Sequence, residues 1–453
     1  MSRHPLVLAL AAVIGAQALL PAAAHAEDLL QTYELARSGD PQFSAAESGR
    51  LVTREGSVQA RAALLPTVTG DASIGRPIAD GDGESTSRDV GVNVRQMVYD
   101  HGNFTRLRSA NALSQAADFR LDSASDTLIT RTSATYFNVL VQLETLAAAE
   151  AAETALKKQF DFASKRLDVG LAPITDVHEA RAQYDSARAS TILARNAVED
   201  AYQALRELTG QPVANLKGLP DDFKPALPET GGADEWVAAA VANNPALKAK
   251  ELELRSAEAD VGTARAGHYP SLYLSGSYGD TTTWGRDAAG SSFRGSDGGG
   301  QIGLTLSVPI FSGGATQSGV RQSLARRDIV QDELEQTRRA LDRDTRNAYQ
   351  TIVAGISEVE ARRLALFSAQ SAYDASQVGL EVGTRTVLDV LNNQNNLFTA
   401  QRAYALARYN YLQNRLLLEQ AAGSLDVEDV QDVNRLLTVD ASTRDLEGAA
   451  TTQ

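Results

Sequence analysis

The sequence predicts a mixed α and β membrane protein built as two tandem structural repeats, with four strands per chain contributing to a β-barrel shared between chains. Three observations support this fold class. The chain repeats its own pattern, its candidate strands alternate apolar and polar residues, and two segments above sixty residues long contain no proline. A helix of sixty residues extends about 90 Å, which is far beyond a compact domain.

The N-terminal segment 1–26 has the pattern of a signal peptide. Arg3 and His4 form a short basic start, and Leu6–Leu20 is almost wholly apolar. Ala24 and Ala26 supply small residues at the two positions that signal peptidase reads, so we expect cleavage after Ala26. The alternative is a membrane anchor, but the apolar run is shorter than the ~20 residues that span a bilayer as a helix.

Composition excludes several classes of function. The chain has no cysteine, so neither disulfides nor thiolate metal sites are available, and its formal charge of −14 without a basic cluster argues against nucleic-acid binding. His178 and Glu179 lack the second histidine of a zinc protease helix. No nucleophile, base and acid pattern and no phosphate loop occur. We therefore expect no enzyme activity, no cofactor, no metal and no nucleic-acid partner.

The internal repeat rests on three groups of matched residues. Pro41 and Pro66 match Pro245 and Pro270 at a spacing of 204, and Gly91 and Gly102 match Gly303 and Gly314 at 212. At a spacing of 213 the matched segments are Val169-Gly170 with Val382-Gly383, Asp176-Val177 with Asp389-Val390, Leu193-Ala194-Arg195 with Leu406-Ala407-Arg408, and Gly210 with Gly423. The spacing grows by eight between the proline and the first glycine anchors. We place that insertion in a Gly- and Ser-rich loop at Asp280–Gly300.

These matches divide the mature chain into a first repeat (27–219), a linker (220–233), a second repeat (234–437) and a polar tail (438–453). Each repeat is expected to begin with a helix of about 35 residues, 27–63 or 234–266, ended by a proline. Two strands follow, and then a long helix, Asn103–Leu167 or Ser318–Leu380. Gly170 or Gly383 turns the chain into a last helix, which Gly210 or Gly423 ends.

The strands are expected at 67–74, 90–98, 271–278 and 301–311, where apolar residues alternate with small polar ones. A soluble sheet packed on a core would alternate in the same way. The small, polar second face and the aromatic residues near strand ends favour a membrane barrel. A four-stranded open sheet would leave unpaired backbone groups in hydrocarbon, so the barrel must be shared between chains. A coiled-coil rod would explain the helices, but not the strands or the repeat.

Five segments carry a resemblance to a known family. They are Arg166–Val177, Val382–Leu391, Ala134–Leu140, Val308–Gly314 and Ala407–Leu412. In combination and in order, they resemble the TolC family of outer-membrane efflux and type I secretion channels. The match covers essentially the whole mature chain, from Asp28 to about Leu437.

The resemblance implies a homotrimer in the cell outer membrane of a Gram-negative bacterium, in contact with outer-membrane lipid. Twelve strands would form the barrel, and a barrel of long helices would extend into the periplasm and close at its hairpin tips. A periplasmic adaptor (membrane fusion) protein and an inner-membrane RND or ABC transporter would recruit and open the channel. Drugs, toxins or proteins would then be exported. The alternative is a static periplasm-spanning tether or an adhesin that never opens.

The resemblance also assigns roles to residues at the tips. Arg385 matches the family's gating arginine, and Thr175 and Asp176 match its partners on the neighbouring hairpin. Asp389 matches the aspartate of a constriction ring, Asn392 replaces the second ring aspartate, and Leu380 replaces a gating tyrosine. The tip turns, expected to dock the adaptor, comprise Val169, Gly170, Leu171, Val382, Gly383 and Thr384. Without the family, Arg385 would be read as a solvated surface residue and Asp389 as a helix N-terminal aspartate.

Overall fold

The computed structural model describes residues 28–77, 85–171, 173–227, 231–287 and 289–441, so the expected signal peptide and the tail from residue 442 lie outside the described residues. The chain divides into two compact units. The sheet unit comprises the described residues of Ala45–Ser125 and Val237–Asp344, and the tip unit comprises the described residues of Met1–Ser44, Asp126–Trp236 and Thr345–Gln453.

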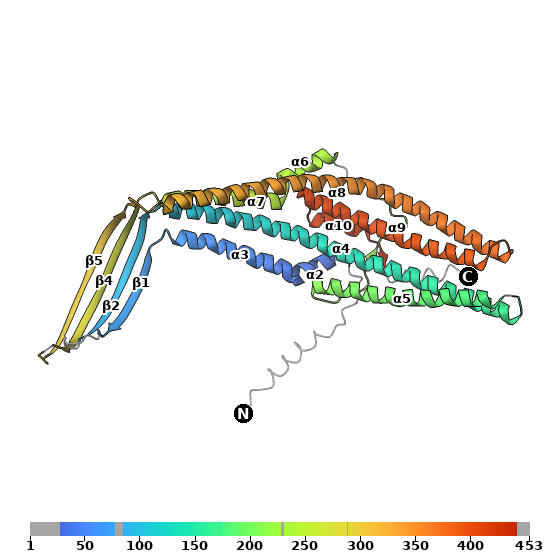
Figure 1. Cartoon of the computed structure of the whole chain (residues 1–453), viewed down its shortest axis with the longest axis horizontal. Coiled ribbons are helices and arrows are strands. Elements are labelled where there is room, and N and C mark those ends of the chain that lie inside the picture. The colour runs from blue at the N-terminus through green and yellow to red at the C-terminus, as the bar shows by residue number, and fades with distance from the viewer. Residues whose placement is uncertain (1–27, 78–84, 172, 228–230, 288, 442–453) are drawn as a thin grey trace, which may run out of the picture. The chain divides into compact units, whose positions relative to one another are not determined.

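Four antiparallel strands form the sheet of the sheet unit. They are β1 (Thr67–Gly75), β2 (Ser85–Tyr99), β4 (Ser271–Arg286) and β5 (Ser292–Ser307), in the order β1-β2-β4-β5 (Figure 1). The two hairpins therefore meet along β2 and β4, which places the two repeats side by side in one sheet. All four predicted strands are present in the described chain.

The two faces of this sheet differ in the way that the alternation predicts. The register aligns Val68, Val94 and Ile302 across the sheet, and these side chains are 65%, 38% and 84% exposed. On the other face Asp89 accepts hydrogen bonds from Ser73 Oγ at 3.2 Å and from Thr281 Oγ1 at 2.7 Å. One face is thus apolar and open, whereas the other is tied together by polar side chains.

The expectation of an inserted loop at Asp280–Gly300 is wrong. Asp280–Arg286 belongs to β4 and Ser292–Gly300 to β5, and the register runs on to the pair Arg286 and Ser292. The extra residues therefore lengthen the second hairpin. Strand propensity depends mainly on how side chains pack. This part of β5 is exposed throughout, so its glycine and serine residues have no core to fill and can still pair with β4.

The two expected 35-residue helices are each broken in two, which corrects the prediction. The observed pairs are α2 (Leu29–Gly39) with α3 (Pro41–Ala62), and α6 (Ala233–Asn243) with α7 (Pro245–Ala266). Proline lacks the N–H of an interior helix position and is tolerated in the first turn. Asp40 caps the new helix by accepting from Phe43 N at 3.2 Å, and Asn244 Oδ1 accepts from Leu247 N at 3.1 Å.

The long helices and their turns agree with the prediction. The described elements are α4 (His101–Asp168), α5 (Ile174–Thr209), α8 (Ala315–Glu381) and α9 (Val387–Ala422). Gly170 and Gly383 adopt φ of 73° and 78° at the two turns, in the left-handed region that favours glycine. Among the described residues, no helix is both long and apolar enough to cross a membrane.

Two small elements were not predicted. Helix α10 (Val427–Leu436) follows α9, and the short strands β3 (Lys217–Gly218) and β6 (Val439–Asp440) pair with each other. Asp426 caps α10 in a capping box with Asp429. An Asp followed three residues later by an acidic residue, before valines at helical spacing, could have revealed this helix.

A polar clamp in the tip unit holds the segment between the repeats. Arg408 is buried and donates through Nη2 to both carboxylate oxygens of Glu144, at 3.1 Å each, and through Nη1 to the Pro220 carbonyl at 3.1 Å. Tyr409 OH donates to Glu144 Oε1 at 3.2 Å and accepts from Leu219 N at 3.3 Å. The buried guanidinium of Arg408, on α9, therefore holds the linker against α4.

Candidate functional site

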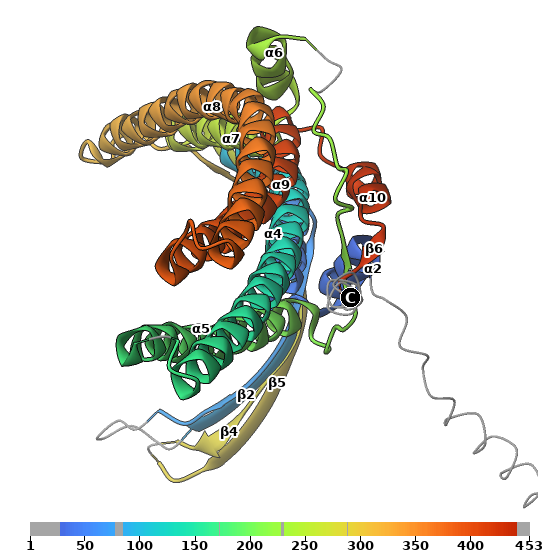
Figure 2. The same cartoon turned by 90° about the vertical axis from the view of Figure 1, so that its right-hand side faces the viewer.

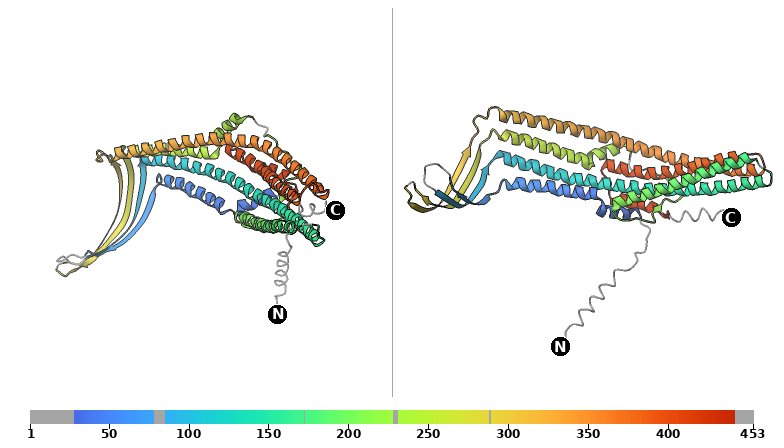
Figure 3. Two further views of the ribbon diagram at one scale, coloured as in Figure 1. Left: turned by 45° about the vertical axis from the view of Figure 1, so that its right-hand side comes forward. Right: turned by 60° about the horizontal axis from the view of Figure 1, so that its bottom comes forward.

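Two helical hairpins end together in the tip unit, at the turns α4–α5 and α8–α9 (Figures 2 and 3). Both turns close in the same way, because Leu171 N donates to the Arg166 carbonyl at 2.7 Å and Thr384 N donates to the Gly379 carbonyl at 2.8 Å. Their apolar side chains are left open to solvent. Val169 and Leu171 are each 68% exposed, and Val382 is 67% exposed.

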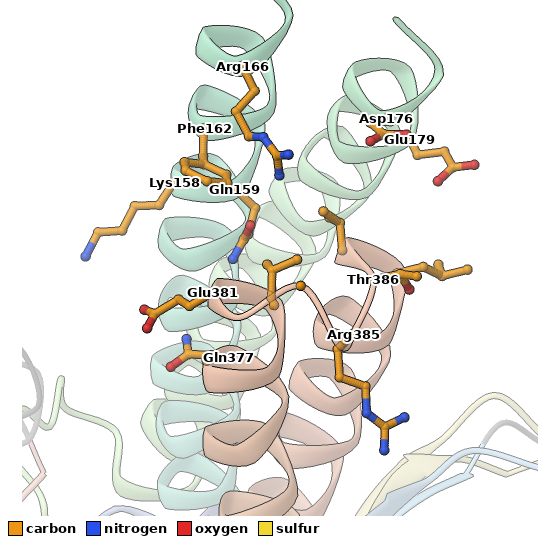
Figure 4. Close-up of a pocket in the computed structure, with 14 residues that line it drawn as sticks. Lys158, Gln159, Phe162, Arg166, Asp176, Glu179, Gln377, Glu381, Arg385 and Thr386 are labelled. Atoms are coloured by element: carbon orange, nitrogen blue, oxygen red, sulfur yellow. The ribbon is translucent and has the colours of Figure 1, made fainter. Parts of the chain in front are cut away.

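A cleft of about 1040 Å³ separates the two hairpins near their turns (Figure 4). Its walls mix charges of both signs with apolar side chains such as Phe162 and Leu380. The charged lining residues are Lys158, Arg166, Asp176, Glu179, Glu381 and Arg385. Most of the site residues predicted for the gate thus lie around a single opening, and Thr175 lies beside it on the first turn of α5.

Within one chain, the structure does not join the predicted latch. Arg385 and Asp176 line the same cleft, but the arginine side chain points away from the aspartate (Figure 4). The Arg385 guanidinium and the Asp176 carboxylate have no hydrogen bond or ion pair within the described part of the chain. The Asp176 carboxylate is therefore available to a group outside this chain, whereas the charge of Arg385 also acts on Asp389.

Leu380 lies half-buried in the cleft wall, at the position where the resemblance would place a tyrosine hydroxyl. Its side chain has no hydrogen-bonding atom, so it contributes only apolar contact. A neighbouring contact explains the path of Arg385, because a Cβ at Gly379 would lie 2.6 Å from Arg385 Cγ. The stem of the arginine therefore lies over a glycine at the end of α8.

Asp389 lies in the first turn of α9 and forms hydrogen bonds with the N-cap residue of that helix. Thr386 is the N-cap of α9, and its N and Oγ1 each donate to Asp389 Oδ2 at 2.9 Å. In return Asp389 N donates to Thr386 Oγ1 at 3.2 Å. The hydrogen bond from the Thr386 backbone, followed by that from its hydroxyl and by the charge of Arg385, lowers the pKa of Asp389 below its ordinary value.

The capping role of Thr386 is a functional feature that sequence reasoning missed. The signal was present as a threonine followed three residues later by an acidic residue, which is the pattern of a capping box. Asn392 lies one turn further along α9 and is exposed. The helix start therefore carries one ionised carboxylate at Asp389 and one neutral amide at Asn392.

Comparison with known proteins agrees with this architecture. The family model described as outer membrane efflux protein matches residues 32–211 and 236–424, one match in each repeat. The outer membrane protein TolC of Vibrio cholerae is 32% identical over 431 residues, covering 94% of this chain and 98% of the relative. TolC of Escherichia coli is 33% identical over 429 residues, covering 92% and 87%.

A solved structure shares the fold at lower identity. The CmeC outer membrane channel of Campylobacter jejuni superposes with a TM-score of 0.77 at 18% identity, covering 91% of this chain and 90% of that chain. The prediction of long helices joined to a β-domain is thereby confirmed, as is the resemblance from which the tip residues were assigned.

Proposed function

Because the chain belongs to the family of outer membrane efflux proteins, we propose that it works as a gated trimeric duct whose hairpin tips open and close the periplasmic end. It is an outer-membrane efflux channel that extends into the periplasm and exports drugs, toxins or proteins. The family is one of channel proteins rather than enzymes, and transport through such a duct requires no chemistry from the chain itself.

The trimer supplies what a single chain lacks. The sheet has four strands, and β1 and β5 each leave one edge unpaired within the described chain. Such edges are excluded from hydrocarbon, so the apolar face can meet lipid only in a closed barrel. Three chains give twelve strands, which lies within the range of outer-membrane barrels.

The observation that carries the gate is that Arg385 and Asp176, near the tips of the two hairpins, make no ion pair with each other within the described part of one chain. Arg385 and Asp176 face the same cleft without bonding in one chain. A threefold arrangement brings the Arg385 of one subunit to Thr175 and Asp176 on the adjacent hairpin of the next. An arginine and a carboxylate make a directional, charge-assisted contact that can be broken and remade.

The exposed turns are the surface that we assign to partners. Val169, Leu171 and Val382 are open to solvent beside Gly170, Gly383 and Thr384. Apolar side chains presented at the end of two hairpins suit a periplasmic adaptor, which would couple the duct to an inner-membrane RND or ABC transporter. The pump would supply the energy and choose the cargo.

We expect Asp389 to form the remaining charged tier of the constriction, so that Asp389→Asn lowers the cation-to-anion permeability ratio several-fold. Three carboxylates around a threefold axis concentrate cations, and Asn392 adds no charge to them. The measurement is the reversal potential of single channels in a salt gradient. Asn392→Asp is the matched control and should raise the ratio. An unchanged ratio in both variants would remove these positions from the pore.

The second candidate, a static tether or adhesin, predicts trimers that conduct no ions. Its distinguishing outcome is the absence of conductance when trimers are present in the bilayer. No feature of the described residues favours it over the duct, because a static rod has no use for opposed charges at its tips.

A further inference from the structure

The two tip hairpins are repeats of each other, yet they begin their second helices differently. At the spacing of 213, Thr386 and Asp389 correspond to Pro173 and Asp176. Both aspartates occupy the first turn of a helix, α9 in one case and α5 in the other. The two starts differ at the N-cap and at the next two positions, where Ile174 and Thr175 correspond to Val387 and Leu388.

The backbone is the same at both N-caps. Pro173 has φ −73° and ψ 155°, and Thr386 has φ −91° and ψ 161°. A difference in hydrogen bonding between the two aspartates consequently follows from the chemistry of the cap residue and not from the path of the chain. Threonine offers a hydroxyl and an N–H, whereas proline offers neither.

That chemistry gives the two carboxylates different partners. Asp389 Oδ2 accepts from both Thr386 N and Thr386 Oγ1 at 2.9 Å. Pro173 makes no side-chain cap, and Asp176 is tied to it only through its own N, which donates to the Pro173 carbonyl at 3.2 Å. Asp176 lines the cleft, and its carboxylate has no hydrogen bond from its own helix within the described residues (Figure 4).

We propose that Pro173 is a positioning residue for the gate: by giving Asp176 no capping partner, it leaves that carboxylate to the Arg385 guanidinium of a neighbouring subunit, whereas Thr386 retains Asp389 for its own helix. The inference rests on the proposed latch. A helix cap and an exposed ion pair have similar strengths, so a cap at Asp176 would compete with Arg385 for the same oxygens.

The test is to give the first hairpin the cap of the second. Pro173→Thr should lower the ratio of closed to open channels about five-fold for each latch, which corresponds to about 1 kcal/mol at 1.4 kcal/mol per tenfold change. Single-channel recording of purified trimers measures the closed and open times. Arg385→Ala sets the fully unlatched level, and Pro173→Ala, which restores the N–H but no hydroxyl, should fall between the parent and Pro173→Thr.

A second background separates the proposed route from a change in turn shape. In Asp176→Asn, Pro173→Thr should have no further effect, because the charged group that it captures is gone. Opening by Pro173→Thr that persists in Asp176→Asn would overturn the inference. If Pro173→Thr stays as closed as the parent while Arg385→Ala opens, the inference fails and the latch stands. If Arg385→Ala also stays closed, both fail.

Discussion

Replacing Arg408 by alanine is expected to destabilise the tip unit by about 3 kcal/mol, because it removes a buried cation from its pair with the half-buried carboxylate of Glu144. The Arg408 side chain is 3% exposed and that of Glu144 is 19% exposed. The substitution also removes the bond to the Pro220 carbonyl, which holds the linker. Denaturant unfolding of the detergent-solubilised protein, followed by far-UV circular dichroism, measures the loss.

The repeat provides the control. Arg195 matches Arg408 at the spacing of 213 and pairs with Glu150 at 2.6 Å, but these side chains are 62% and 41% exposed. An exposed pair contributes ~0–1 kcal/mol, so Arg195→Ala should shift the unfolding midpoint only slightly. We expect the loss of stability to depend on how deeply the arginine is buried, and not on the motif that the two positions share. Equal shifts of the unfolding midpoint for Arg195→Ala and Arg408→Ala would contradict this.

Replacing Glu419 by glutamine is expected to remove a pH dependence of stability. Burial, followed by the charge of Asp429, raises the pKa of Glu419 from 4.5 to about 7, against the opposing effect of Arg415. Arg415 Nε lies 3.3 Å from Glu419 Oε1, and Oε2 is buried without a hydrogen-bond partner in the described chain. Asp429 on α10 has its own pKa raised by burial, the N-cap residue Asp426 adds charge beside it, and Asp432 on the same helix lies 4.0 Å from Arg415.

The sign follows from the raised pKa. The folded chain holds the Glu419 proton to higher pH than the unfolded chain, so its stabilising contribution is full below pH 4.5 and is lost as the pH rises through about 7. The loss is on the order of 3 kcal/mol. Glutamine mimics the protonated form, so the variant should match the parent near pH 4.5 and exceed it at pH 8.

The control for this pH series is Glu428→Gln, at an exposed position in the first turn of α10. It should leave the slope of stability against pH unchanged between pH 4.5 and pH 8, the range in which Glu419 titrates. Denaturation midpoints measured across this pH range give the slope for the parent and for both variants. A parental slope that persists in Glu419→Gln would assign the titration to Asp429 or to another group.

Periodicity and punctuation in the sequence were sufficient for most of the fold. Alternation located the strands, and the left-handed glycines Gly170, Gly383, Gly210 and Gly423 marked the turns and helix ends, because few other residues adopt that conformation. These signals are local. They predict the local structure well because most of the chain forms long, regular helices and strands.

Features that depend on a choice between local alternatives were harder to predict. Pro41 and Pro245 are compatible with a helix end or a first turn, and the caps at Asp40 and Asn244 decide for a break. The stretch Asp280–Gly300 has the composition of a loop, yet it pairs as strand because its partners continue beside it. Neither outcome can be read from composition alone.

The roles assigned to the site residues stay predictions. Arg385, Asp176 and Leu380 line one cleft, whereas the hydrogen bonds of Thr386 to Asp389 were overlooked. A sequence shows which residues can cap a helix, but which hydrogen bonds Asp389 makes depends on side-chain geometry. The same geometry distinguishes Asp389 from its repeat partner Asp176.

The most direct test of the gated duct is the single-channel conductance of the purified trimer in a planar bilayer, beside Arg385→Ala. Leu380 offers no hydroxyl to the latch, so Arg385 should hold the closed state nearly alone. We predict a small, steady conductance for the parent and a clearly larger one for Arg385→Ala. A variant as closed as its parent would contradict the latch, and no conductance from either, with trimers confirmed in the bilayer, would support a static tether.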